Sequence, residues 1–213
     1  ACIHFWLPNL DSSANDKISN QLSYFKSAKA WLIIAIISIG TGGLFSWITY
    51  ISPMVTHVGG LPESRVPIIM ILVGLGMFFG NILGGKLADT ISPTKAAIAC
   101  FSAMSLTLLV VYFTAHISHM SYIMAFVTGM VAFTTGSPLQ MMLIQSAKGS
   151  ETIAAAAGQA SFNIGNTLGA YFGGIPITYG FAYHSPVLIG VGMAFIGACL
   201  ALTYLVKFTT KNA

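Results

Sequence analysis

Six long apolar segments, separated by short stretches that hold nearly all of the charged residues, constrain this chain more than any other feature. Crossing about 30 Å of bilayer hydrocarbon takes roughly 20 residues of α-helix, and each segment is long enough. Backbone polar groups find no water at that depth, so each segment is expected to satisfy them within a helix. The sequence therefore predicts an all-α membrane protein with six transmembrane helices. The predicted spans are residues 30–55, 66–85, 95–115, 121–145, 152–179 and 186–206.

The composition agrees with a protein that is embedded in a lipid bilayer. Hydrophobic residues make up 55% of the chain and charged residues 7%, against roughly 25% charged residues in a soluble domain. The mean hydropathy is +0.81. The net charge of +4 is spread thinly, without a basic run, which argues against nucleic-acid binding. Cys2, Cys100 and Cys199 are too few and too scattered for a metal site or a disulfide framework, so neither a metal nor a cofactor is expected.

The basic residues predict how the spans are oriented. In the predicted topology, every basic residue except Arg65 falls on one side of the bilayer. The residues on that side are Lys17, Lys26, Lys29, Lys86, Lys95, Lys148, Lys207 and Lys211. Basic residues concentrate on the cytoplasmic side, so this side and both ends of the chain are expected to be cytoplasmic. His57, His116, His119 and His184 fall at the opposite ends of the spans; we expect interfacial, solvated side chains there, with pH sensing as the alternative.

The first 29 residues differ from the rest of the chain. Residues 1–7 are apolar but too short to cross a bilayer, so they are expected to be the end of a preceding helix that is truncated upstream. Residues 9–29 are polar and predict a cytoplasmic linker. Ile18, Leu22 and Phe25 share one helical face, so a short helix on the membrane surface and a solvated connector are both open. Residues 30–213 are then the six-helix transmembrane domain.

Glycines recur at every fourth position in the second and fifth spans, at the spacing that lets two helix backbones pack closely. The two sets are Gly76, Gly80, Gly84, Gly165, Gly169 and Gly173. Residues 40–43 (GTGG) and 136–138 (GSP) interrupt the first and fourth spans. The interruptions match between spans one and four, and the glycines match between spans two and five, which predicts two inverted three-helix repeats. Paired interruptions of this kind indicate a transporter's binding site. Ordinary helix kinks are the alternative.

Polar side chains within the spans are candidates to contact a substrate, because an amide facing lipid would lose its hydrogen bonds. Gln159, Asn163 and Asn166 share one face of the fifth span, beside the glycines. Gln140 and Gln145 in the fourth span, and Trp47 and Tyr50 in the first, are expected to join them around a central cavity. The alternative is hydrogen bonding between helices without any substrate.

A charged hairpin joins the second and third spans. It contains residues 85–89 (GKLAD) and Lys95, and Ser92 before Pro93 is expected to begin the third helix. The hairpin resembles the signature G-x-L-A-D-R-x-G-R-K of the major facilitator superfamily, although Thr90, Ser92 and Pro93 replace the usual basic residues and glycine. Together with residues 137–140 (SPLQ) and 161–166 (SFNIGN), it makes the chain similar to the second half of bacterial arabinose-efflux-permease-like transporters.

This resemblance implies the C-terminal six-helix half of a twelve-helix carrier in the bacterial inner membrane. Its partners would be the missing N-terminal half, the lipid bilayer and a small-molecule substrate, a sugar or a drug, exported by alternating access, with proton antiport as the expected coupling. The resemblance also implies that Asp89, with Gly85 and Lys95, forms a conformational latch against the opposite half, and that the glycines at 76, 80 and 84 let the halves slide. No Asp, Glu, Lys or Arg lies deep within a span, so a coupling carboxylate must come from elsewhere.

Two other classes of function are alternatives to transport. An intramembrane enzyme needs a Ser/His pair, paired aspartates or a metal cluster, and Ser137 has no visible base nearby, so the chain is not expected to be an enzyme. A non-transporting membrane scaffold or receptor is the other alternative, favoured only by the absence of coupling charges.

Overall fold

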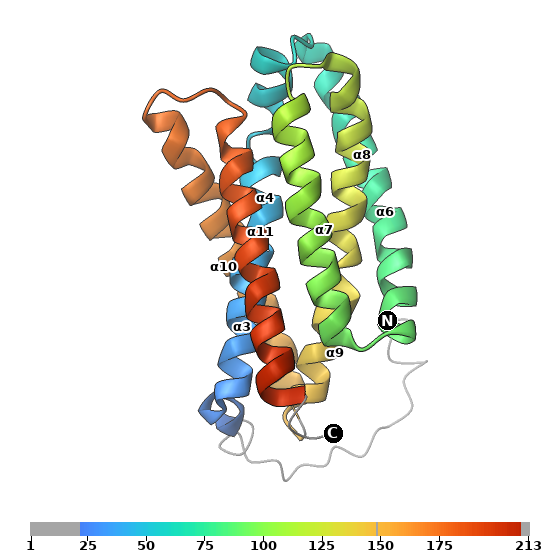
Figure 1. Ribbon diagram of the computed structural model, residues 1–213, viewed down its shortest axis with the longest axis vertical. Coiled ribbons are helices and arrows are strands. Elements are labelled where there is room, and N and C mark those ends of the chain that lie inside the picture. Colours follow the sequence, from blue (N-terminus) through green and yellow to red (C-terminus); the bar gives the residue numbers. More distant parts are fainter. Residues whose placement is uncertain (1–21, 148, 210–213) are drawn as a thin grey trace, which may run out of the picture.

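The computed structural model describes residues 22–147 and 149–209, and all regular structure in these ranges is helical (Figure 1). The α-helices are α3 (Ala28–Gly40), α4 (Gly42–Ile48), α5 (Ile51–Pro53), α6 (Val66–Thr90), α7 (Pro93–Thr114), α8 (Ser118–Thr134), α9 (Gly136–Ser146), α10 (Glu151–Thr178) and α11 (Ser185–Tyr204). Short 3-10 turns cover Leu22–Lys26 and Glu63–Arg65, and π-helical turns cover Met54–Val58 and Leu205–Thr209. The predicted all-α class is confirmed.

Five helical segments are long and apolar enough to cross a membrane. They are Ala28–Ile48, Glu63–Thr90, Pro93–Thr114, Ser118–Ser146 and Ser185–Phe208. The remaining predicted span is α10, which is 28 residues long but less apolar, because it carries Gln159, Asn163 and Asn166. Five of the six predicted spans therefore meet both criteria, and α10 meets the criterion of length.

The predicted hairpin is present between α6 and α7. Helix α6 ends at Thr90, and α7 begins at Pro93 after Ser92, whose backbone is extended (φ −60°, ψ 139°). Pro93 tolerates the first helical position because its missing N–H would have no partner there. This hairpin lies at the same end of the bundle as the start of α3 and the ends of α9 and α11 (Figure 1).

The first and fourth spans are each interrupted at a threonine. Thr41 separates α3 from α4 and Thr135 separates α8 from α9, close to the predicted interruptions. The Thr41 hydroxyl donates to the Ile37 carbonyl at 2.7 Å. Pro138, which lacks an N–H, removes one hydrogen bond from the start of α9. Both threonines keep αR backbone angles, so the interruptions are local and the two segments of each span remain roughly collinear.

The two glycine sets lie where helix backbones meet. On α6, a Cβ added at Gly84 would lie 2.6 Å from the Thr134 carbonyl oxygen of α8, and one added at Gly80 would collide with the Met130 carbonyl. On α10, a Cβ at Gly173 would lie 3.2 Å from the Ser46 Cα of α4. The interpretation that the α6 glycines form a sliding surface between two halves is wrong, because α8 of the same chain covers them.

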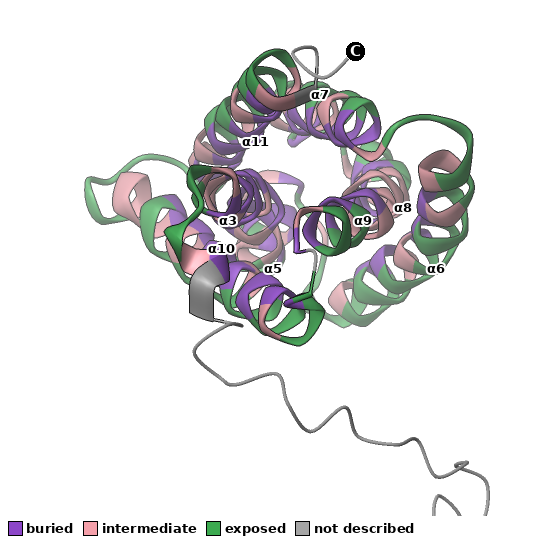
Figure 2. Cartoon of the chain, turned by 90° about the horizontal axis from the view of Figure 1, so that it is seen from below, coloured by how far each residue is buried: buried purple, intermediate pink, exposed green. Residues whose placement is uncertain are grey.

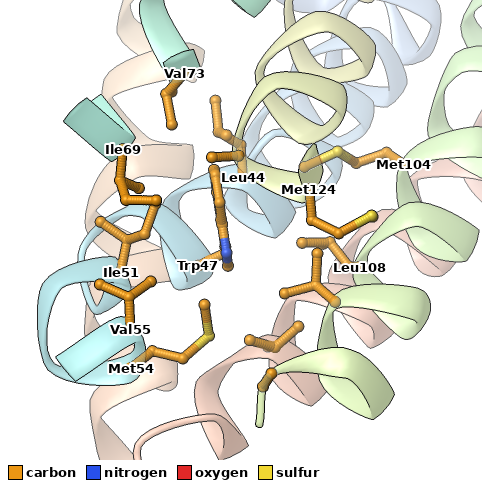
Figure 3. Close-up of a cluster of buried hydrophobic side chains, with 14 of the residues drawn as sticks. Leu44, Trp47, Ile51, Met54, Val55, Ile69, Val73, Met104, Leu108 and Met124 are labelled. Carbon is orange, nitrogen blue, oxygen red and sulfur yellow. The ribbon is translucent and has the colours of Figure 1, made fainter. Parts of the chain in front are cut away.

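Large apolar side chains point both into the bundle and away from it. One buried cluster surrounds Trp47, whose side chain is 1% exposed, with Leu44, Leu108 and Met124 around it (Figure 3). On α6, by contrast, Phe78 is 61% exposed. Viewed along the helices, α6 and α10 lie at opposite edges and turn much of their surface outward (Figure 2). Such exposed apolar surface is expected of helices whose surroundings are hydrocarbon rather than water.

Part of the predicted linker packs against the bundle. Residues 1–21, including Ile18 of the predicted surface helix, lie outside the described residues. Leu22 and Phe25 belong to the 3-10 turn Leu22–Lys26, in which Tyr24 is buried and its hydroxyl pairs with the Ser146 hydroxyl of α9 at 3.2 Å. A hydrogen bond to α9 favours an anchored connector over a freely solvated one for this turn.

His57 and His184 make ring contacts at the connection between α10 and α11, at the end of the bundle opposite the hairpin. The His57 ring stacks on Tyr183 with 4.9 Å between ring centroids, and His184 lies against Tyr112 of α7 at 4.8 Å. The connection is thereby fixed to both the first span and the third. These contacts give the two histidines a packing role at the end of the bundle.

Candidate functional site

A cavity of about 640 Å³ lies between the two interrupted spans and the helices α6, α7 and α10. Its size is within the range of small-molecule sites. Its lining includes Gly40, Thr41, Phe45, Asn81, Gly85, Asp89, Phe101, Phe133, Thr135, Gly136, Ser137, Gln140, Gln159, Phe162 and Asn163. The cavity reaches from the middle of the bundle to the hairpin end of α6, while the cluster around Trp47 fills the space toward the opposite end.

Both helix interruptions open onto this cavity. Thr41 and Thr135, the two residues at the breaks, line its wall together with Gly136. A Cβ added at Gly136 would meet nothing within 4 Å, whereas one at Gly40 would meet the ring of Phe101. Each threonine hydroxyl donates within its own span, Thr41 to the Ile37 carbonyl and Thr135 to the Val131 carbonyl at 3.3 Å. The irregular backbone at the two breaks therefore borders a cavity, which is where interrupted membrane helices are tolerated.

Three of the predicted amide side chains meet in the cavity. Gln159 and Asn163 reach it from α10, and Gln140 reaches it from α9. Among the described residues, none of these three amide groups has a hydrogen-bond partner, so each is free to bind a solute or water. Amides that can both donate and accept are suited to hydroxyl and carbonyl groups of a neutral solute.

The remaining predicted contacts lie elsewhere. Asn166 is exposed, as Gln140, Gln159 and Asn163 are, but it does not line the cavity, and it lies about 4.5 Å further along α10 than Asn163. Trp47 is enclosed in the apolar cluster of Figure 3. The Tyr50 hydroxyl donates to the Ala170 carbonyl of α10 at 2.8 Å. Gln145 lies outside this cavity, near the end of α9.

We expect Tyr50→Phe to lower the stability of the protein and to leave solute affinity unchanged. The variant removes one hydrogen bond between helices, which is worth about 0.6 kcal/mol on average in membrane proteins. Thermal unfolding and equilibrium binding of the full-length protein would measure the two effects. Tyr171→Phe is the matched control, because Tyr171 is 67% exposed on α10. A weaker affinity at unchanged stability would instead make Tyr50 a binding residue.

Asn81 was missed by the sequence reasoning. It lies on α6, lines the cavity, and donates from Nδ2 to the Met77 carbonyl at 3.2 Å. Gly85 follows Asn81 by four residues and Asp89 follows it by eight, so all three lie on one face of the helix. An amide inside an apolar span was the available signal, and it is the same signal that identified Asn163. The cavity also contains the rings of Phe45, Phe101, Phe133 and Phe162, which periodicity alone does not separate from ordinary core residues.

Asp89 gives the cavity its charge. It is the only charged side chain among the described lining residues, it is exposed, and no described basic side chain forms an ion pair with it. A Cβ at the neighbouring Gly85 would meet nothing within 4 Å, so this part of α6 faces open space. Lys95 lies on α7 beyond the hairpin and does not line the cavity. The described residues contain no group of three or more His, Cys, Asp or Glu that could hold a metal ion.

Comparison with known proteins assigns residues 4–161 to the Major Facilitator Superfamily model. The chain is 35% identical over 204 residues to the "Putative transporter AraJ" of Escherichia coli K12, covering 96% of this chain and 52% of that protein. It is 28% identical over 203 residues to the "Inner membrane transport protein YdhP" of the same strain, covering 95% and 51%. It is 26% identical over 208 residues to a "Probable sugar efflux transporter" of Haemophilus influenzae, covering 97% and 50%. The chain thus spans about half the length of the curated relatives that it matches.

Proposed function

The chain belongs to the Major Facilitator Superfamily, and we propose that it forms the C-terminal six-helix half of a carrier that moves a small solute across a membrane by alternating access. The observation that carries this proposal is the cavity in which two interrupted helices, three unpaired amides and one carboxylate meet. The family is one of transporters, so the chain is not an enzyme.

The proposed architecture is two inverted three-helix repeats, with α10 as the sixth span. The packing of the helices supports it. The second span, α6, packs against the fourth through its glycines, and the fifth, α10, packs against the first through its own. The third and sixth spans, α7 and α11, pack against each other. A pseudo-two-fold axis between the repeats would exchange span one with four, two with five and three with six. This exchange turns the pair of spans two and four into the pair five and one, and it keeps spans three and six together, so the observed set of pairs is unchanged.

We propose that six further helices, contributed by the other half of the carrier, complete the cavity. The support is the open side of the cavity and the relatives, which are about twice as long as this chain. In the arrangement described here, solute would enter from the hairpin end, because the cluster around Trp47 fills the opposite end. Closing the hairpin end and opening the other would complete the cycle.

The proposed solute is a sugar or an amphiphilic drug-like molecule that is exported. Unpaired amides suit hydroxyl groups, the four phenylalanine rings suit a ring face or an apolar body, and the Haemophilus influenzae relative is named a sugar efflux transporter. Proton antiport is the proposed coupling. Apart from Asp89, the described lining residues include no carboxylate, so the coupling group would come from the other half.

Saturable counterflow by the full-length protein in liposomes would test the proposal. Liposomes preloaded with an unlabelled sugar or drug should accumulate the labelled form transiently, and unlabelled solute outside should compete. Solute binding without counterflow would reject transport and favour a receptor or scaffold. We do not expect an imposed pH gradient to stimulate counterflow. Net movement of solute against its concentration gradient, in contrast, should require a pH gradient.

The proposed location is the bacterial inner membrane with the hairpin end in the cytoplasm, supported by the name of YdhP and by the basic residues of that end. In a variant without native cysteines, we expect a membrane-impermeant maleimide to label Glu63→Cys in intact cells. Ser92→Cys, in the hairpin, should be labelled only after the membrane is permeabilised. Both residues are exposed, so access to the reagent depends on the side of the membrane alone. The reverse pattern of labelling would overturn this orientation.

A further inference from the structure

A small cavity of about 10 Å³ lies within the apolar cluster around Trp47, near the end of the bundle opposite the hairpin. It is enclosed by the first span, the end of α7 and the start of α8, and it shares no lining residue with the larger cavity described above. Three of its described lining residues are polar, and these are Trp47, Thr114 and Ser121. The proposed function assigns no ligand to this cavity.

Two of the polar groups around the small cavity are buried without a partner. Trp47 is 1% exposed and Ser121 is 8% exposed, and neither the indole Nε1 nor the Ser121 Oγ has a hydrogen-bond partner among the described residues. The indole nitrogen points into the cluster rather than out of it (Figure 3). Buried polar groups are normally paired with protein or with ordered water, because an unpaired group loses its hydrogen bonds to water without replacement. Two such groups at one cavity therefore indicate a polar ligand.

The backbone of the first span covers the Ser121 hydroxyl without pairing with it. A Cβ added at Gly59, directly after the π-helical turn Met54–Val58, would lie 3.2 Å from Ser121 Oγ. The Ser118 hydroxyl, one turn earlier in α8, donates to the Gly59 carbonyl at 2.6 Å. Ser118 is thus paired within the protein, whereas Ser121 lines the small cavity unpaired.

The volume and the polar groups of the small cavity fit one water molecule. The smallest cavities that hold a single water have a volume of roughly 10–15 Å³, and a buried water makes about three hydrogen bonds. The Trp47 Nε1–H can only donate, whereas the Ser121 hydroxyl can donate or accept. The Thr114 hydroxyl donates to the Val110 carbonyl at 2.7 Å, and its oxygen can still accept. A water molecule can accept from Trp47 and donate to both hydroxyls, and a larger solute would exceed the volume.

We propose that this cavity holds one ordered water molecule, hydrogen-bonded to Trp47 Nε1, Ser121 Oγ and Thr114 Oγ1. The water connects the first, third and fourth spans at the end of the bundle that apolar side chains otherwise fill. The site does not depend on the proposed transport function. In the proposed cycle, opening this end would let bulk water take the place of the bound water, so the same three groups would be hydrated in both states.

Replacing Ser121 by alanine tests the proposal through the sign of the change in stability. With a bound water, Ser121→Ala removes one of the water's partners and should lower the unfolding temperature of the full-length protein by about 1–4 °C. Without a water, the same variant removes an unpaired buried hydroxyl and should leave the unfolding temperature unchanged or raise it.

The matched control is Thr128→Val, also on α8. Thr128 is 0% exposed, its hydroxyl has no partner among the described residues, and it does not line the small cavity. Removing this hydroxyl should therefore not lower the unfolding temperature. A Ser121→Ala variant that is as stable as Thr128→Val would overturn the proposal.

A structure of the full-length protein in the arrangement described here, at a resolution that shows ordered waters, would observe the site directly. We expect a density peak about 2.5–3.2 Å from Trp47 Nε1 and Ser121 Oγ. A cavity without density, or a direct bond from Trp47 Nε1 to a protein acceptor, would also overturn the proposal. Neither measurement involves a transported solute, so a failure of the transport proposal would not change the result.

Discussion

Replacing Asn163 by alanine is expected to weaken solute affinity about 10- to 100-fold while the protein remains folded. The Asn163 amide reaches the larger cavity from α10 without a partner among the described residues. A solute group that loses its hydrogen-bonding partner in such a site is destabilised by about 1–3 kcal/mol, and each 1.4 kcal/mol corresponds to a tenfold change in affinity. The stability of the protein should change little, because no intramolecular hydrogen bond of the side chain is removed.

The matched control is Asn166→Ala, which makes the same change on the same helix outside the cavity lining. Equilibrium binding and counterflow by the full-length protein would measure affinity, and thermal unfolding would monitor the fold. Gln159→Ala should act in the same direction as Asn163→Ala. If Asn163→Ala left binding and transport unchanged, the side chain would have no role beyond helix packing. If Asn166→Ala were the more damaging variant, the solute would bind further along α10 than the cavity indicates.

Exchanging Asp89 for asparagine is expected to change the ratio of inward-facing to outward-facing carrier. We propose that Asp89, with Gly85 beside it, acts as a latch that meets the positive end of a helix in the other half. An anion at a helix N-terminus contributes about 0.3–1 kcal/mol, and up to about 2 kcal/mol when partly buried. Removing it should therefore shift the ratio about 2- to 30-fold, since 1.4 kcal/mol corresponds to a factor of ten. The open surroundings of Gly85 leave room for such an approach.

Cysteine accessibility from each side of the membrane would measure the population of the two states. Lys86→Gln is the control, because Lys86 lies in the same hairpin but does not line the cavity. A latch changes the ratio of the states and leaves the affinity within each state nearly unchanged. Asp89 also lines the cavity, however, and a selective loss of affinity at an unchanged ratio would make it a solute-binding residue. If neither the ratio of the states nor the solute affinity changed, the only remaining role of Asp89 would be to keep the end of α6 solvated.

The sequence was sufficient for features that depend on a continuous stretch of chain. Burial in hydrocarbon requires about 20 apolar residues and a hydrogen-bonded backbone, so the spans could be located from composition along the chain. Ser92 and Pro93 located the hairpin, because their preferences for a helix start are local. The interruptions at Thr41 and Thr135 followed from nearby glycines and Pro138 for the same reason.

The tertiary structure decided which side chains share the cavity. Gln159, Asn163 and Asn166 share a face by spacing, but the cavity extends only as far as Asn163, and α10 leans outward beyond it (Figure 1). Depth along the helix and its tilt are set by packing against α3 and α4, which no local pattern specifies. Tyr50 is likewise paired with Ala170, 120 residues away in the sequence, so its partner could not be read from its neighbours.

The sequence by itself thus determined the approximate positions of five apolar spans, the hairpin and the helix interruptions, because each is specified by backbone hydrogen bonding and by the solvent around one segment. Only the tertiary structure decided that the glycines of α6 contact α8, that Asn81 and Asp89 face the same cavity as Asn163, and that Trp47 does not. These facts depend on the rotation and depth of each helix relative to its neighbours, and both are fixed by contacts between segments distant in the sequence.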